Sequence, residues 1–434
     1  MKYYNLKDKE EVVDFKTATI KGQGKEKGLF FPEYIPQFDT DFIENLDQYS
    51  DEEIAFRCMK DFVGEEIPLD VLKQIVSETI NFEIPLKKIN ENIYSLELFH
   101  GPTLAFKDVG ARFMSRCLSY FLKDENKKVT VLVATSGDTG GAVANGFYNT
   151  ENINVIILYP KNRVSEVQEK QLTALGENIF ALEVDGSFDD CQNLVKQAFA
   201  DDEINSTLFL TSANSINVAR WLPQQIYYLL ALKQWQKLEK ENPVICVPSG
   251  NFGNICAGIL AHSRGLPVEH FIAACNENDV VPHYLKTQKL EPKETIATLS
   301  NAMDVGNPSN FVRILELFEN EFQNLQHTIS GYSINNKETL HLIREVYEKY
   351  NYLLEPHGAV AYAALEKYLT ENPNKKGFIL ETAHPVKFPD AVEKATNIKI
   401  ELPESLQDLM KKDKKSTEIA PDFEELKRFL LNKN

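Results

Sequence analysis

The chain of 434 residues is acidic: 47 lysines and arginines stand against 64 aspartates and glutamates, which gives a net charge of −17. This balance argues against nucleic acid and against an anionic membrane surface as partners, because both repel an acidic protein. Hydrophobic residues make up 43% of the chain, enough for a sizeable core. Domains of roughly 100–200 residues would divide this length into two or three.

The scattered cysteines indicate a reducing compartment, and the hydrophobic runs indicate neither a signal peptide nor a membrane span. The six cysteines are scattered without a CxxC pair, so neither a zinc site nor a disulfide framework is indicated. The N-terminal stretch "MKYYNLKDKEEVVDF" lacks the apolar segment of a signal peptide. A membrane span needs about 18 apolar residues in a row, and the sequence has no such run. We therefore predict a cytoplasmic protein.

Residues 1–90 are predicted to form a helical N-terminal region. Within it, "DTDFIENLDQYSDEEIAFRCMKDFV" combines helical spacing of apolar residues with acidic helix starts. From residue 127 the pattern changes: "KKVTVLVATSGDTGGAVANGFY" is typical of a strand, a Gly-rich turn and a helix of small residues. The stretch "NPVICVPSGNFGNICAGILAHSRG" repeats this order.

Further strands and helices alternate along the rest of the chain. Strands are expected at "NINVIILYP", "NIFALEVDG", "VEHFIAACN" and "GFILETA", and helices at "VSEVQEKQLTAL" and "FDDCQNLVKQAFA". Ser187 and Asp190 form a capping box at the start of the latter helix. Strands that are apolar throughout and alternate with helices predict an α/β fold with mostly parallel sheets. Ligands of such folds bind beyond the C-terminal ends of the strands.

One lysine stands out in the stretch "LFHGPTLAFKDVGARFM". Lys107 follows a run of mostly apolar and small residues and precedes Asp108. Burying an amine costs free energy unless it is paired or used covalently, so this lysine is a candidate for covalent chemistry.

The Gly-rich loop "PSGNFGN" is a candidate phosphate site. Gly250 and Gly253 allow close approach of the backbone, and the loop opens a helix whose N–H groups suit an anion. A tight turn without a ligand remains the alternative. The motifs GxxxxGK[ST] and GxGxxG are both absent, which disfavours a nucleoside triphosphate or a dinucleotide.

A second loop, "TSGDTGG", offers hydroxyls from Thr135, Ser136 and Thr139 next to a helix start. These donors suit a carboxylate or a phosphate. Asp138 is an awkward neighbour for an anion, and the alternative is a capped turn in which Asp138 satisfies the helix start.

A third helix start, in "ANSINVARWLPQ", places Ser215 and Arg220 five residues apart. An arginine near a helix N-terminus suits an anionic group, although an ordinary surface ion pair remains the alternative. The histidines show no HExxH-like spacing, so a catalytic metal has little support. The sequence also lacks the GxSxG motif of an α/β-hydrolase triad.

A lysine in an apolar loop, two Gly-rich anion sites and an α/β frame together indicate pyridoxal phosphate as the cofactor. The lysine would form the Schiff base, one helix start would hold the cofactor phosphate, and the second anion site would face the substrate.

The chain resembles the threonine synthase family of fold-type II pyridoxal-phosphate enzymes. The resemblance rests on "LFHGPTLAFKDVGARFM", "ATSGDTGGAVA", "NSINVAR", "PSGNFGN", "MDVGNPSN" and "TAHPVKF", which occur in family order. It implies that Lys107 is the Schiff-base lysine and that Thr382 hydrogen-bonds the pyridine nitrogen. It also implies that Asp138 lies near the ring. The implied phosphate cradle consists of Gly250, Asn251, Phe252, Gly253 and Asn254.

The implied reaction converts O-phospho-L-homoserine and water to L-threonine and phosphate. The residues implied on the substrate side are Thr135, Ser136, Thr139, Ser215 and Arg220. Asn217 and residues 307–310 are expected to be structural.

Three other functions remain open at this stage. They are a related phospholyase that releases a 2-oxo acid, a serine or threonine dehydratase of the same fold type, and a non-catalytic pyridoxal-phosphate carrier. No motif indicates the oligomeric state.

The implied fold has two α/β domains with the cofactor in the cleft between them. We expect a helical N-terminal region over residues 1–90 and a smaller, substrate-side domain with the Schiff-base lysine over 91–220. The domain that binds the cofactor phosphate is expected over 221–400, and a helical tail over 401–434.

Overall fold

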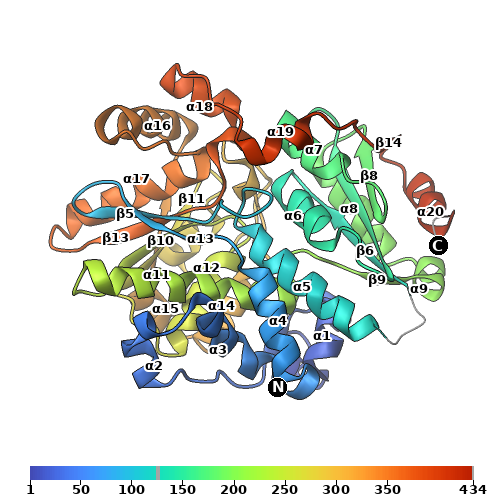
Figure 1. Ribbon diagram of the computed structural model, residues 1–434, viewed down its shortest axis with the longest axis horizontal. Helices are drawn as coiled ribbons and strands as arrows, with labels where there is room; N and C mark the ends of the chain where they lie inside the picture. The colour runs from blue at the N-terminus through green and yellow to red at the C-terminus, as the bar shows by residue number, and fades with distance from the viewer. Residues whose placement is uncertain (124–127, 433–434) are drawn as a thin grey trace.

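Two mostly parallel sheets dominate the computed structural model, which describes residues 1–123 and 128–432 (Figure 1). The six-stranded sheet has the order β12 (Ile329–Ser333), β11 (His270–Cys275), β10 (Val244–Pro248), β13 (Gly377–Glu381), β5 (Ile93–Glu97) and β4 (Leu86–Lys88). Its neighbours are all parallel except β4, which runs antiparallel to β5.

The second sheet is parallel throughout. Its order is β14 (Ser416–Ile419), β8 (Ile179–Val184), β7 (Ile153–Pro160), β6 (Val129–Ala134) and β9 (Phe209–Thr211). The central strands of both sheets are buried along their whole length, which explains their continuous apolar sequences. The α/β class and the parallel sheets expected from the sequence are confirmed.

Helices cover both sheets. Around the six-stranded sheet lie α11 (Gln225–Leu238), α12 (Gly253–Ser263), α13 (Val280–Thr287), α14 (Phe311–Leu317), α15 (Phe322–Thr328), α16 (Asn336–Tyr350), α17 (Pro356–Glu371) and α18 (Pro389–Thr396). Around the five-stranded sheet lie α6 (Asp138–Phe147), α7 (Glu166–Thr173), α8 (Phe188–Ala198), α9 (Asp202–Thr207), α19 (Glu404–Met410) and α20 (Phe423–Asn432). Helix α8 begins with the predicted capping box of Ser187 and Asp190.

The two halves share a hydrophobic core. Helix α5 (Lys107–Leu122) lies between them in Figure 1, and its apolar face packs into the core cluster that also contains residues of β6 and β10. The short helix α10 (Val218–Trp221) packs against α5. The described chain also contains short 3-10 helices at Lys25–Lys27, Leu46–Gln48, Gly64–Glu66, Leu222–Gln224, Asn301–Met303 and Pro385–Lys387.

The N-terminal region differs from the helical prediction because it also contains strands. Its helices are α1 (Phe15–Lys21), α2 (Thr40–Glu44), α3 (Asp51–Val63) and α4 (Leu69–Thr79). A three-stranded antiparallel sheet in the order β2 (Val12–Asp14), β1 (Lys2–Asn5) and β3 (Phe30–Pro32) accompanies them. Strands of three or four residues carry too short an alternating pattern to be recognised from sequence.

The topology also shifts two expected boundaries. Strand β5 lies in the range assigned to the smaller domain, yet it pairs with β13, so the five-stranded sheet begins only at β6. The tail from residue 401 is not purely helical, because β14 adds a strand beside β8. In both cases the pairing partner is distant in sequence and invisible to a local pattern.

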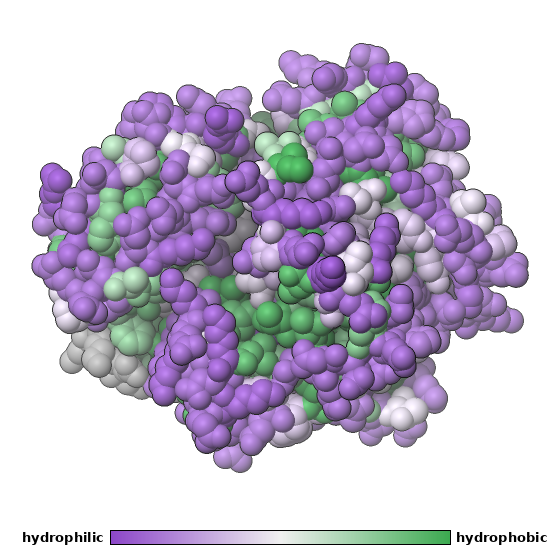
Figure 2. Space-filling model, turned by 180° about the vertical axis from the view of Figure 1, so that it is seen from behind, coloured by the Kyte–Doolittle hydropathy of each residue, from purple (hydrophilic) through white to green (hydrophobic). Residues whose placement is uncertain are grey.

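The surface agrees with the acidic, hydrophilic composition. Figure 2 shows the face behind that of Figure 1 as largely hydrophilic, with apolar residues gathered in one area near its middle. In the described part of the chain, none of the helices combines the length and the apolar character that crossing a membrane requires.

Candidate active site

The candidate site lies where strands of both sheets end. Strand β5 leads into the segment that ends at Lys107, the first residue of α5. The amide of Phe106 donates to the carbonyl oxygen of Thr382 at 2.9 Å, and Ala105 pairs with Ala383 in an isolated bridge. Lys107 is therefore held beside the residue that follows strand β13.

The amine of Lys107 is nearly buried and has few close polar partners. Its side chain is 16% exposed, and Nζ lies 4.0 Å from Oδ2 of Asp138 and 5.0 Å from the centre of the Phe106 ring. Within the described chain this Nζ makes no hydrogen bond. Burial lowers the pKa of Lys107, which favours the neutral, nucleophilic amine.

Asp138 belongs to an ion cluster and does not cap its helix. One oxygen, Oδ1, accepts from Lys387 Nζ at 2.8 Å and from Gln168 Nε2 at 2.9 Å. The N-cap of α6 is Gly137, which provides no side-chain capping bond. Burial alone would raise the pKa of Asp138, but the cations Lys387 and Lys107 hold it well below its usual range.

The three hydroxyls of this loop have different surroundings. Oγ1 of Thr135 accepts from the amides of Gly137 and Gly140 at 3.0 and 2.9 Å, so this hydroxyl holds the loop together. Ser136 and Thr139 are only partly buried. They are the hydroxyls of the loop that a ligand can reach.

The second Gly-rich loop connects β10 to α12. Phe252 has a left-handed backbone with φ 61°, which turns the chain into the helix. Within the described residues, the N–H groups of Gly250, Asn251 and Phe252 donate to no other atom. Consecutive unpaired N–H groups at a helix start form a site for an anionic oxygen group.

Side chains from two distant segments brace this loop. Nδ2 of Asn251 donates to Ser215 Oγ at 2.8 Å, and its Oδ1 accepts from the amide and the hydroxyl of Ser309 at 2.8 and 2.7 Å. Asn310 also donates to Ser215 Oγ, at 3.0 Å. Ser215 thus braces the loop after β10, and the substrate contact that the resemblance implies for it stays a prediction.

The glycines of the loop are needed for this close packing. A Cβ at Gly250 would lie 2.5 Å from Cα of Met303, and one at Gly253 would lie 3.2 Å from Cβ of Ser215. Asn254 is buried: Oδ1 accepts from the Tyr228 hydroxyl at 2.7 Å, and Nδ2 has no partner within the described chain. The unpaired N–H groups and this orphaned amide fit a phosphate-bearing cofactor.

Arg220 occupies a separate place near the lysine. It lies on α10, where Asn217 caps the helix start, and its guanidinium donates to the carbonyl oxygen of Ala213. A Cβ at Gly110, one turn along α5 from Lys107, would lie 3.1 Å from Nε of Arg220. That Nε is buried and lacks a partner among the described residues, so it is available to an anion.

Sequence reasoning missed three buried residues of the site. Lys387 and Gln168 hold Asp138 in place. Arg313 donates to the carbonyl oxygens of residues 30, 215 and 216, so it anchors the loop of Ser215 to the N-terminal region. Lys387 stood in the quoted motif "TAHPVKF", and a lysine among apolar residues is the same signal that identified Lys107.

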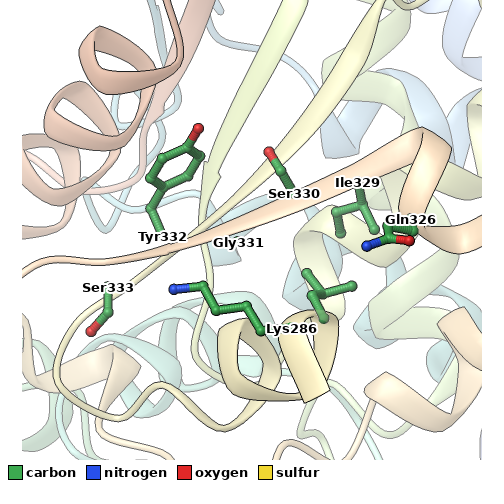
Figure 3. Close-up of a pocket in the computed structure, with 8 residues that line it drawn as sticks. Lys286, Gln326, Ile329, Ser330, Gly331, Tyr332 and Ser333 are labelled. Atoms are coloured by element: carbon green, nitrogen blue, oxygen red, sulfur yellow. The ribbon is translucent and has the colours of Figure 1, made fainter. Parts of the chain in front are cut away.

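A separate pocket of about 380 Å³ lies along β12, the edge strand of the six-stranded sheet (Figure 3). Its lining includes Leu285, Gln326, Ser330 and Tyr332, with Lys286 as the charged member, and it contains no part of the lysine site. Within the described residues, no group of three or more His, Cys, Asp or Glu side chains could hold a metal ion.

Three family models match this chain, and together they cover nearly all of it. "Threonine synthase N terminus" covers residues 2–80, "Pyridoxal-phosphate dependent enzyme" covers 78–380, and "Threonine synthase, C-terminal" covers 358–430. A threonine synthase of Haemophilus influenzae is 46% identical over 431 residues, which span 99% of this chain and 100% of the relative.

Two solved structures are similar over the full chain. The threonine synthase of Escherichia coli is 44% identical with a TM-score of 0.93, and the match covers 100% of both chains. The structure of PLP-bound threonine synthase from Brucella melitensis is 34% identical, also with a TM-score of 0.93, and the match covers 100% of this chain and 99% of that one.

Proposed function

The chain belongs to the threonine synthase family of pyridoxal-phosphate-dependent enzymes, and on that premise we propose that it converts O-phospho-L-homoserine and water to L-threonine and phosphate. The observation that carries the proposal is the nearly buried amine of Lys107, which lies 4.0 Å from Asp138. The chain also offers two sets of unpaired donors that suit anions: the N–H groups of the loop after β10, and the buried Nε of Arg220.

Residues on this chain would hold pyridoxal phosphate at three points. The N–H groups of residues 250–253 would bind the cofactor phosphate, and Thr382 would offer its hydroxyl to the pyridine nitrogen. Lys107 is the attachment point, because its amine has no hydrogen bond to lose within the described chain. When bound, the cofactor supplies an electron sink for negative charge on the substrate α-carbon.

Lys107 is also the proton carrier of the proposal. Its four-carbon stem is flexible, so one amine can reach neighbouring carbons in turn. Burial keeps that amine more readily neutral, as a base requires. Asp138, 4.0 Å away, stabilises the protonated form that each proton transfer produces.

Arg220 is proposed to bind the phosphate of the substrate. Its unpaired Nε lies beside Gly110, the residue one turn along α5 from Lys107. A buried guanidinium binds phosphate strongly because little water competes. Ser136 and Thr139, in the loop after β6, are proposed to add hydroxyl donors for the substrate. Thr135 stabilises that loop, since its hydroxyl accepts hydrogen bonds from the amides of Gly137 and Gly140 in the same loop.

Product analysis tests the proposal. Purified holoprotein is incubated with O-phospho-L-homoserine, and phosphate and carbon products are followed together. We expect threonine and phosphate in a one-to-one ratio. Phosphate with 2-oxobutyrate in place of threonine would instead assign a phospholyase, and the absence of phosphate release would overturn the substrate assignment.

A further inference from the structure

Two lysines share one buried carboxylate at the site. Asp138 is 4% exposed, and Lys387 is completely buried. Lys387 Nζ lies 2.8 Å from Asp138 Oδ1 and also donates to the carbonyl oxygen of Thr103 at 2.9 Å, whereas Lys107 Nζ lies 4.0 Å from Oδ2. Lys387 is therefore the nearer partner of the carboxylate and is fully engaged.

We propose that Lys387 is a positioning residue of the reaction: it is the permanent counter-ion of Asp138, so that Lys107 can gain and lose its charge without leaving a lone buried carboxylate. This inference rests on the proposed attachment of pyridoxal phosphate to Lys107.

Charge balance supports this division of roles. A buried ion that loses its partner is strongly destabilising. With Lys107 as its sole cation, Asp138 would hold the lysine in its protonated form and resist both cofactor attachment and proton removal. Lys387 removes that constraint, because Asp138 keeps a cation at 2.8 Å whatever the state of Lys107.

The same lysine joins three segments of the site. It ends the 3-10 helix Pro385–Lys387, which follows β13 of the six-stranded sheet, while Asp138 follows β6 of the five-stranded sheet. Its bond to Thr103 reaches the turn before α5, where the amide and hydroxyl of Thr103 donate to Asp108 at 2.9 and 2.5 Å. The ion pair thus connects the C-terminal ends of both sheets at the attachment point.

The groups that face Lys107 come from four elements. Asp138 at the start of α6 and Glu355 at the start of α17 raise the pKa of Lys107, whereas Lys387 and Arg220 lower it, in addition to the larger effect of burial. Removing Lys387 therefore raises the pKa of Lys107, and removing the charge of Asp138 lowers it. The two changes act in opposite directions.

The test measures how fast the full-length apoprotein attaches pyridoxal phosphate, as a function of pH and without substrate. The absorbance change on attachment gives the rate, and the pH profile reports the ionisation of Lys107. We expect K387M to move the profile to higher pH by about one unit or more, and to slow attachment near pH 7.5 about tenfold. D138N should move the profile to lower pH.

Three controls separate this role from simple loosening. K387R keeps the charge and should keep the profile near that of the wild type. The double variant K387M/D138N removes both charges, and its profile should lie between those of the single variants; it also replaces K387M if that protein fails to fold. K427M breaks a distant ion pair with Asp201 at 2.9 Å and should change nothing.

Two results would overturn the proposal. One is a K387M profile that does not move, and the other is movement of K387M and D138N in the same direction, which general loosening would produce. Because no substrate is used, failure here is distinguishable from failure to form threonine.

Discussion

The two halves of the site hold charge in different ways. On the side of the β10 loop, neutral groups surround the anion position: backbone N–H groups, the amides of Asn251 and Asn310, and the hydroxyls of Ser215 and Ser309. On the side of α5, the partners are ions: Nζ of Lys107 lies 4.0 Å from one carboxylate oxygen of Asp138, and Nζ of Lys387 lies 2.8 Å from the other.

Two buried carboxyl groups have pKa values that shift in opposite directions, because Asp138 has cations as partners and Glu381 has another carboxyl group as its neighbour. The lysines hold the pKa of Asp138 below its usual range. Glu381, directly before Thr382, is fully buried, and burial together with Glu355 raises its pKa well above the usual range. Its Oε2 has no partner within the described chain. A fixed phosphate can be held by neutral donors, whereas a proton-transfer centre needs charges that compensate one another.

Removing the reactive amine of Lys107 should cause the largest loss of activity. We expect Lys107→Ala to reduce threonine formation by at least about 10³-fold, because both the attachment point and the proton carrier are lost. Threonine production is measured with enzyme saturated in pyridoxal phosphate. Near-normal formation by this variant would contradict the role of Lys107.

Adding a methyl group to either glycine of the β10 loop should weaken cofactor binding, and the loss should be larger at Gly250 than at Gly253. Gly250→Ala places a Cβ 2.5 Å from the backbone of Met303, whereas Gly253→Ala meets the side chain of Ser215 at 3.2 Å. Overpacking of this kind costs about 1–3 kcal/mol, and the backbone clash should cost more. Pyridoxal-phosphate affinity and urea unfolding are compared, and a greater loss in Gly253→Ala would contradict the packing argument.

A smaller effect is expected from one bracing hydroxyl. Ser309→Ala removes the 2.7 Å bond to Asn251 Oδ1 but keeps the bond from the Ser309 amide. A neutral hydrogen bond contributes about 1 kcal/mol, so cofactor affinity should fall about fivefold. The matched control is Ser263→Ala, whose hydroxyl bonds to Ile259 at the far end of α12. Equal losses in the two variants would contradict a specific brace.

The last prediction concerns stability and its dependence on pH. The native state keeps the Glu381 proton at pH values where the unfolded chain loses it, so the free energy of unfolding falls as pH rises above about 4.5. Glu381→Gln has no proton to lose and should show a shallower decline between pH 5 and pH 8. Urea unfolding measures the slope, and the exposed Glu424→Gln should keep that of the wild type. Identical slopes in Glu381→Gln and the wild type would place the carboxyl pKa elsewhere.

The sequence was informative about local patterns at both sides of the site. The central strands β6, β7, β8, β10, β11 and β13 were expected from their continuous apolar runs, and the Gly-rich loops were expected at their ends. These features depend on neighbouring residues alone. The pairing of β5 with β13 and of β14 with β8 depends on contacts between distant segments, which no local pattern reports.

The same distinction explains which site residues could be found. Lys107 was recognisable because a lysine in an apolar loop is unusual. The partnership of Asp138 with Lys387 joins residues 249 positions apart, so the sequence offered Asp138 a helix cap or a place near the ring, but not this ion pair. Ser215 was assigned to the substrate side, and only the fold brings it to Asn251.

The identity of the cofactor-bearing lysine tests the account most directly, since Lys107 and Lys387 flank the same carboxylate. The holoprotein is reduced with borohydride and digested, and the peptide that carries the pyridoxyl group is identified by mass spectrometry. The account predicts the label on Lys107, whose amine makes no hydrogen bond within the described chain. A label on Lys387 would contradict it, because that amine would then be the attachment point and not the permanent counter-ion.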